Sequence, residues 1–273
     1  MKKAILACDG KNFPKGAFEF IKELQLKEPL FVAGVFLHAL NFEMMIPGLF
    51  AVTPEPVMEF LKNEHEEYEN TIKEFRVLCE RNALEYSVHE ESKEWKIKDL
   101  VKESRFADFI AVSANFFRTD FNTPEPNFPL QQIMRQAECP IMVFPEEFSQ
   151  TDRVVIAYDG SKSAMCALKE FCRIFPELQD KPVKVVFVKD EDSDEIPDMD
   201  FLEEYAGRHF TNLTFEKLRF NTKKFFADWA REQNNMLLVC GSYSHSGIAD
   251  VFRENFAEEV IRTQSNAVFV SHY

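Results

Sequence analysis

Two Asp-Gly turns stand where two similar apolar stretches of the sequence end. The first is Asp9-Gly10, and the second is Asp159-Gly160, followed by Ser161. A carboxylate at the end of a strand can accept hydrogen bonds from an adenine amino group or a ribose hydroxyl. Glycine allows a tight turn into a helix, and Ser161 is a candidate helix N-cap. The alternative is turn chemistry alone, because Asp-Gly pairs are common in turns.

A loop of small and hydroxyl-bearing residues follows a later apolar stretch, 236–240. The loop reads Gly241-Ser242-Tyr243-Ser244-His245-Ser246-Gly247. The backbone amides of such a loop can hold an anion. His245 has no acidic residue near it in sequence that could orient it as a base. We therefore predict no catalytic residue and no enzyme activity.

The chain contains two copies of one sequence pattern, and these copies must position the turns and the loop. A basic residue, an apolar run and Asp-Gly recur in the same order in both copies. The spacing between the copies shortens toward the end of the chain, so the first copy is longer, mostly at 41–56. The matching segments are 3–10 and 153–160, 108–112 and 236–240, and 140–144 and 267–271.

Short apolar runs alternate with amphipathic helical patterns in both copies. Most runs are almost wholly apolar, which is typical of strands buried on both faces of a parallel sheet. The pattern predicts an α/β fold with two doubly wound, Rossmann-like domains in tandem, each with a five-stranded parallel sheet. We place the domains at 1–147 and 151–273, with a short polar linker at 145–152. The predicted strands are 3–8, 30–37, 84–88, 107–112, 141–144, 153–158, 183–188, 213–218, 236–240 and 267–270.

The composition excludes several classes of function. The net charge is −14 and both copies are acidic, so binding to nucleic acid or to an anionic membrane is disfavoured. No apolar run approaches the length of a membrane span. The chain runs from Met1 directly into a strand-like stretch, so we expect no signal peptide. These features predict a soluble, cytoplasmic protein.

Cysteine, histidine and aspartate spacings do not predict a metal site. No C-x-x-C pair and no H-x-x-x-H pair occurs, so we expect reduced thiols and no zinc. Asp190, Asp192 and Asp194 have the spacing of a calcium loop. The motif's glycine position is Glu195, however, and its final glutamate position is Phe201. We therefore predict a solvated acidic loop.

The aspartate that ends the first strand, the small-residue loop after the fourth and the closing apolar strand resemble those of the universal stress protein family. Cys139-Pro140 before a last strand also resembles the family's usual Cys-Pro. The resemblance covers essentially the whole chain, as two tandem copies. It implies the adenine nucleotide alpha hydrolase-like fold. One branch of the family binds ATP through Gly-x-x-Gly, a nine-residue spacer and Gly-Ser/Thr, and the other branch lacks this motif.

The chain departs from the ATP-binding motif. Gly241 is the first motif glycine, but Ser244, Glu254 and Asn255 stand at the next three motif positions, and Gly247 matches a glycine common inside the spacer. A carboxylate at Glu254 would oppose a phosphate charge about 4 Å away by roughly 4 kcal/mol at an effective dielectric near 20. A carboxylate at a helix N-terminus is favourable, so we expect Glu254 to fill the anion position itself. The first copy keeps none of the motif glycines.

The resemblance therefore implies the branch that does not bind ATP. We expect a non-enzymatic stress-response protein that acts through partner or dimer surfaces and carries a degenerate nucleotide site. The alternative is an adenine-nucleotide sensor that binds ATP or AMP through the second domain. The candidate ligand-binding residues are Asp9 in the first copy and Asp159, Gly160, Ser161, Val188, Gly241, Ser242, Ser244, Gly247, Glu254 and Asn255 in the second.

The last strand of each copy, 141–144 and 267–270, is an apolar edge candidate. In family members the last strands of two domains pair across a two-fold axis. We therefore expect the copies to form an intramolecular pseudo-dimer. The sequence also leaves open a further association of whole chains into a homodimer through the apolar segment 44–50, and an unidentified protein partner.

Overall fold

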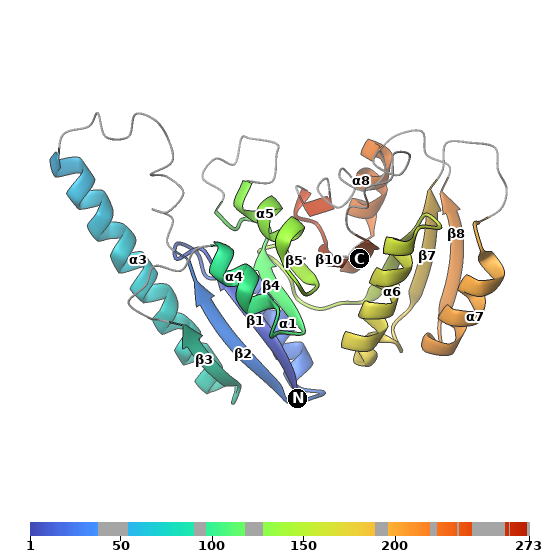
Figure 1. The fold of residues 1–273 in the computed structure, drawn as a ribbon, viewed down its shortest axis with the longest axis horizontal. Coiled ribbons are helices and arrows are strands. Elements are labelled where there is room, and N and C mark those ends of the chain that lie inside the picture. Colours follow the sequence, from blue (N-terminus) through green and yellow to red (C-terminus); the bar gives the residue numbers. More distant parts are fainter. Residues whose placement is uncertain are drawn as a thin grey trace.

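The computed structural model describes residues 1–37, 54–89, 97–117, 128–188, 196–218, 223–233, 235–241, 260–261 and 263–271. One ten-stranded sheet runs through the molecule in the order β3-β2-β1-β4-β5-β10-β9-β6-β7-β8 (Figure 1). We call β1–β5, with their helices, the first half, and β6–β10 the second half. Each half has the strand order of a doubly wound sheet, which confirms the predicted fold class.

The first half alternates strands and helices along the chain. Its strands are β1 (Lys2–Cys8), β2 (Leu30–Phe36), β3 (Glu85–His89), β4 (Phe109–Ser113) and β5 (Ile141–Phe144). Its helices are α1 (Lys15–Gln25), α3 (Pro54–Arg81), α4 (Ile97–Ser104) and α5 (Phe128–Gln136).

The second half repeats this alternation. Its strands are β6 (Arg153–Tyr158), β7 (Val183–Val188), β8 (Leu213–Leu218), β9 (Met236–Gly241) and β10 (Ala267–Ser271). Its helices are α6 (Lys162–Ile174), a 3-10 turn η2 (Pro176–Leu178), α7 (Met199–His209) and α8 (Lys223–Glu232).

The strands inside each half pair in parallel, and their burial follows their place in the sheet. All residues of β4, β5 and β10, near the centre, are buried. The edge strands β3 and β8 are mostly half-buried and carry charges such as Glu85, Glu216 and Lys217. Charged side chains on an edge strand oppose pairing with another chain.

The two halves meet where β5 pairs with β10 in the antiparallel sense. Val143, Met142 and Ile141 lie opposite Val268, Phe269 and Val270, respectively. The expected pairing of the two last strands is therefore present. It makes one continuous sheet, and the outer strands of the halves diverge to either side of the junction (Figure 1).

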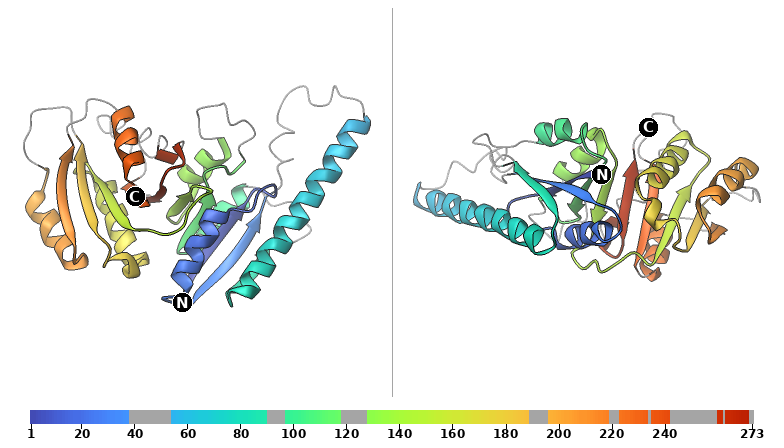
Figure 2. Two further views of the ribbon diagram at one scale, coloured as in Figure 1. Left: turned by 180° about the vertical axis from the view of Figure 1, so that it is seen from behind. Right: turned by 90° about the horizontal axis from the view of Figure 1, so that it is seen from below.

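Helices cover both faces of the sheet, as right-handed crossovers require. Buried side chains of α1, α3, α6 and α7 pack on one face. Those of α4, α5 and α8, with Val260 and Ile261, pack on the other. The right view of Figure 2 shows α4 and α5 on the opposite side of the first half from α1 and α3. Among the described residues, no helix is long and apolar enough to cross a membrane.

Candidate functional site

The sheet places the two Asp-Gly turns at equivalent points. β1 pairs with both β2 and β4, and β6 pairs with both β7 and β9. In each half, the chain first adds strands on one side of β1 or β6 and then continues on the other side, so the strand order reverses there. Ligands of doubly wound proteins bind at this point, outside the carboxyl ends of the strands. Asp9 and Asp159 follow β1 and β6 directly. Each half therefore has one candidate site.

In the first half, the carboxylate of Asp9 accepts hydrogen bonds from the chain's own backbone. Oδ1 accepts hydrogen bonds from the backbone N–H groups of Lys11 (3.0 Å) and Asn12 (3.1 Å). Oδ2 accepts one from the backbone N–H of Phe117 (3.0 Å), in the loop after β4. Asp9 is 6% exposed. The aspartate predicted to hold a base or ribose thus ties together the two loops between which a ligand would enter.

Helix α3 packs against the same turn. Gly10 has a φ of +75°, and a Cβ built on it would lie 2.9 Å from Cδ2 of Tyr68 and 3.2 Å from the carbonyl oxygen of Leu37. The hydroxyl of Thr71 donates to the carbonyl oxygen of Gly10 (3.3 Å). Glycine is required here by both the backbone conformation and the close approach of the helix.

A second carboxylate lies at the carboxyl end of β4. Oε1 of Glu146, two residues beyond β5, accepts hydrogen bonds from the hydroxyl of Ser113 (2.7 Å) and from Nδ2 of Asn115 (3.4 Å). Oδ1 of Asn115 accepts a hydrogen bond from the side chain of Gln264 in the second half. Ser113 is the counterpart of Gly241 in the repeat, the first position of the motif considered in the sequence. In the first half, this donor pair binds an internal carboxylate.

Replacing Asp9 by alanine should cost far more stability than replacing Asp159. Asp9→Ala leaves three backbone N–H groups without their acceptor, so we expect unfolding free energy to fall by about 2–4 kcal/mol. Asp159 is only half-buried, so water can replace lost contacts, and Asp159→Ala should cost about 1 kcal/mol. Urea unfolding of both variants measures the difference. Equal losses would contradict the assignment of Asp9 to closing the first site.

The turn of the second half has the predicted local structure. Oδ1 of Asp159 accepts from the backbone N–H of Ser161 (2.9 Å), and Gly160 has a φ of +79°. The hydroxyl of Ser161 accepts from the backbone N–H of Ala164 (3.2 Å), so the predicted N-cap of α6 is confirmed. Pro197 packs against the turn. A Cβ built on Gly160 would lie 2.8 Å from Cβ of Pro197.

The missing side chain of Gly241 serves helix packing. A Cβ at this position would lie 2.4 Å from the carbonyl carbon of Ser163, 2.5 Å from its oxygen and 2.7 Å from the nitrogen of Ala164. The first turn of α6 therefore lies directly on the end of β9. Val188 ends β7, so Asp159, Val188 and Gly241 follow or end three neighbouring strands, as predicted.

Two carboxylates act on the end of β6. Burial raises the pKa of the Tyr158 hydroxyl, and the charges of Asp198 and Asp159 raise it further. Like charges at this strand end oppose a polyanionic ligand.

Five predicted ligand-binding residues lie outside the described residues: Ser242, Ser244, Gly247, Glu254 and Asn255. The acidic segment from Asp190 to Glu195 and the apolar segment 44–50 lie outside them as well. The sequence reasoning missed Glu146, Asn115, Thr71 and Phe117, which form hydrogen bonds around the turn of Asp9 and the end of β4. Their partners are distant in the sequence, so no local spacing marks them.

Solved structures show what this chain is similar to. No family model matches the sequence, and no curated protein matches it significantly. A universal stress protein from Archaeoglobus fulgidus DSM 4304 aligns with 99% of this chain and 96% of its own, with a TM-score of 0.71 and 17% identity. A protein of Pseudomonas aeruginosa UCBPP-PA14 that is assigned to the universal stress proteins aligns with 100% and 94%, with a TM-score of 0.55 and 13% identity.

Both alignments span the whole chain, so the similarity extends to the arrangement of the two halves. The fold is therefore that of a tandem universal stress protein, with two Rossmann-like α/β units in one chain. The resemblance drawn from the sequence is confirmed at the level of the fold.

Proposed function

We propose that this chain is a non-enzymatic stress-response protein of the cytoplasm, that it acts through its surfaces, and that its nucleotide sites are degenerate. The hydrogen bond from the Phe117 backbone N–H to Asp9 carries the proposal, because it closes the first site between its two loops. The bond from Ser113 to Glu146 supports it, because it fills the phosphate position with a carboxylate. The division into domains at 1–147 and 151–273 is part of the same proposal.

Thiol chemistry gives an argument against covalent catalysis in the described part of the chain. Burial raises the pKa values of Cys79, Cys139, Cys172 and Cys240 to about 12. At neutral pH these thiols are almost wholly protonated, and the thiolate is the nucleophilic form. The described thiols therefore suit a structural role.

An adenine-nucleotide sensor is the second candidate, and only the second half favours it. Gly160, Ser161 and Gly241 follow or end the neighbouring strands β6 and β9, at the edge where we expect a ligand. The first half offers no equivalent, because the carboxylate of Asp9 bridges its loops. Any nucleotide would then bind once per chain.

Calorimetry with Mg-ATP and with AMP separates the two candidates. We expect no binding tighter than about 100 μM to the wild-type chain. The variant Ser244→Gly, Glu254→Gly, Asn255→Ser restores the motif in the second half and should gain affinity, because it removes a like charge from the phosphate position. Asn127→Gly with Phe128→Ser in the first half is the matched control and should gain none. Micromolar binding by the wild type would favour the sensor.

A further inference from the structure

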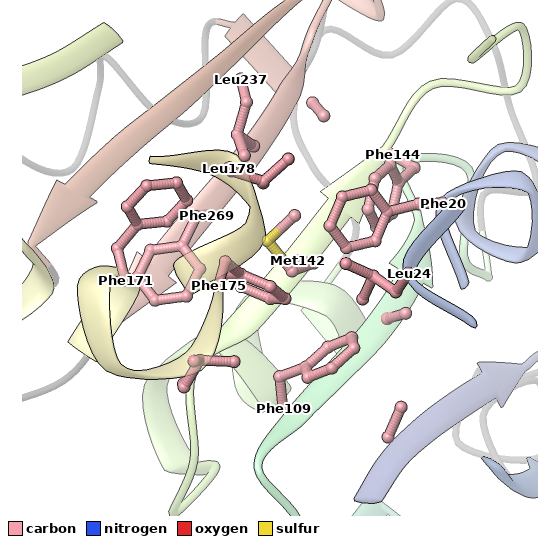
Figure 3. Close-up of a cluster of buried hydrophobic side chains, with 14 of the residues drawn as sticks. Phe20, Leu24, Phe109, Met142, Phe144, Phe171, Phe175, Leu178, Leu237 and Phe269 are labelled. Atoms are coloured by element: carbon pink, nitrogen blue, oxygen red, sulfur yellow. The ribbon is translucent and has the colours of Figure 1, made fainter. Parts of the chain in front are cut away.

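Phenylalanines from both halves fill one face of the β5–β10 junction (Figure 3). All six of these side chains are fully buried. The first half contributes Phe20, Phe109 and Phe144, and the second half contributes Phe171, Phe175 and Phe269.

Phe175 is the side chain that the second half inserts into the first. Its ring centroid lies 5.5 Å from that of Phe20 and 5.2 Å from that of Phe109, both in edge-to-face geometry. The ammonium of Lys2, also in the first half, lies 6.0 Å from the same centroid. Phe20 therefore has an aromatic partner across the junction as well as Phe144 (5.0 Å) within its own half.

The contributions of the two halves are complementary. The parallel registers align β4 with β9 and β5 with β10. Counted back from the aligned strands β2 and β7, Leu24 of α1 corresponds to Phe175, the residue after α6. At four pairs of equivalent positions, one half has phenylalanine and the other half has a different and smaller side chain. The pairs are Leu24 and Phe175, Phe109 and Leu237, Met142 and Phe269, and Phe144 and Ser271.

One of these pairs lies on the pseudo-two-fold axis itself. Met142 and Phe269 are equivalent in the repeat, and they face each other directly in the antiparallel pairing. Two second halves joined in the same way would place phenylalanine against phenylalanine at this point. Two first halves would place methionine against methionine. Closely packed cores tolerate neither the excess volume nor the void without loss of stability.

Charge distinguishes the halves at the amino ends of the strands. Nζ of Lys2 lies 3.0 and 2.9 Å from the carboxylate oxygens of Glu177 across the junction, and both side chains are largely buried. The equivalent of Lys2 in the second half is Asp152, whose carboxylate accepts a hydrogen bond from Asn235 (2.7 Å) within that half. Two second halves paired in this way would bring Asp152 toward Glu177, which are like charges.

Two first halves would lack the carboxylate of Glu177. Nζ of Lys27, in the turn after α1, donates to the carbonyl oxygen of Glu177 (3.2 Å), so the turns after α1 and α6 adjoin at the junction. In a pair of first halves, the turn with Lys27 would take the place of the turn with Glu177. Lys2 would then keep its ion pair with Glu28 of its own half (2.8 Å), but it would lose Glu177 and gain the charge of Lys27 nearby.

From these contacts we propose that the junction is specific for one first half and one second half. The surface of the first half around β5 thus fits the second half of this chain and excludes another first half. The chain closes its sheet on itself, and neither β5 nor β10 serves as an assembly surface for further copies. This inference does not depend on whether a nucleotide binds.

Pairing of separated halves tests the specificity directly. A protease site inserted between the exposed residues Ser149 and Gln150 lets the linker be cut after folding. The cut protein is unfolded in urea, refolded by dilution and weighed by native mass spectrometry. We expect complexes with one half of each kind. A random mixture of like and unlike pairs would overturn the proposal. Lys2→Glu in the same cut protein places a carboxylate beside Glu177, so it should lower the share of unlike pairs, and an unchanged share would contradict the role of this charge.

The intact chain provides a second test that needs no refolding of halves. Met142→Phe and Phe269→Met each make the axis position alike in the two halves, and each should lower Tm by about 3–6 °C. Combining them transposes the two side chains and restores one large and one smaller partner, so the double variant should lose less than the sum of the singles. Additive losses, or single variants that are as stable as the wild type, would refute local complementarity.

Discussion

Replacing Phe175 with alanine is expected to lower the free energy of unfolding by about 3–5 kcal/mol. The side chain is fully buried and packs against Phe20 and Phe109 of the first half and against Phe171 (5.7 Å) and Phe269 (5.9 Å) of its own half. Its loss would leave a cavity that rigid strands on both sides of the junction cannot fill. Urea unfolding followed by tryptophan fluorescence measures the change.

The matched control is Phe201→Ala on α7. Phe201 is 74% exposed, so its truncation should change the unfolding free energy by less than about 0.5 kcal/mol. We also expect Phe175→Ala to unfold in one transition if the junction couples the halves into one cooperative unit. Similar stabilities for the two alanine variants would show that the phenylalanine cluster does not hold the halves together.

Two helical glycines should respond to alanine in opposite directions. A Cβ on Gly16 of α1 would lie 2.0 Å from the carbonyl oxygen of Pro145 and 3.0 Å from Cβ of Phe148. The linker passes directly over α1 at this point, so Gly16→Ala must displace backbone. We expect it to cost about 3 kcal/mol.

Gly207 of α7 is the matched position, because a Cβ there meets nothing within 4 Å. Alanine restricts the unfolded chain and favours the helix, so Gly207→Ala should stabilise the protein by about 0.5–1 kcal/mol. Thermal unfolding of the two variants provides the comparison. Stabilisation by Gly16→Ala would mean that the linker does not pass over α1 as described.

The strands could be predicted from the sequence because most of them are buried on both faces. In the second half, the predicted bounds of β6, β7 and β8 coincide with those of the structure. In the first half, β4 begins at Phe109 and not at position 107. Asp108 lies before the strand because its carboxylate accepts a hydrogen bond from the backbone N–H of Lys3 (2.9 Å). Side-chain capping of this kind leaves no mark in an apolar pattern.

The site could be predicted only in outline. Asp9 and Asp159 belong to identical Asp-Gly turns, and the sequence treats them alike. The sequence does not show that Asp9 accepts a hydrogen bond from the backbone N–H of Phe117, a contact between loops that are distant in the chain. Every residue except proline has a backbone N–H, so no sequence motif can identify this donor. The phenylalanines are visible in the sequence, but their complementarity can be recognised only when the strand register aligns the two copies.

The order of synthesis gives the position of β10 a consequence for folding. Strand β10 follows all the other described strands in the chain, yet it lies at the centre of the sheet, between β5 and β9. Until residues 267–271 leave the ribosome, β5 has an open edge, and the apolar side chains beside it lack their cover. A nascent first half therefore exposes Phe109, Phe144 and an unpaired strand while the whole second half is translated. Such intermediates aggregate or bind chaperones, so the synthesis of residues 267–271 decides when β5 and the apolar side chains beside it can be covered.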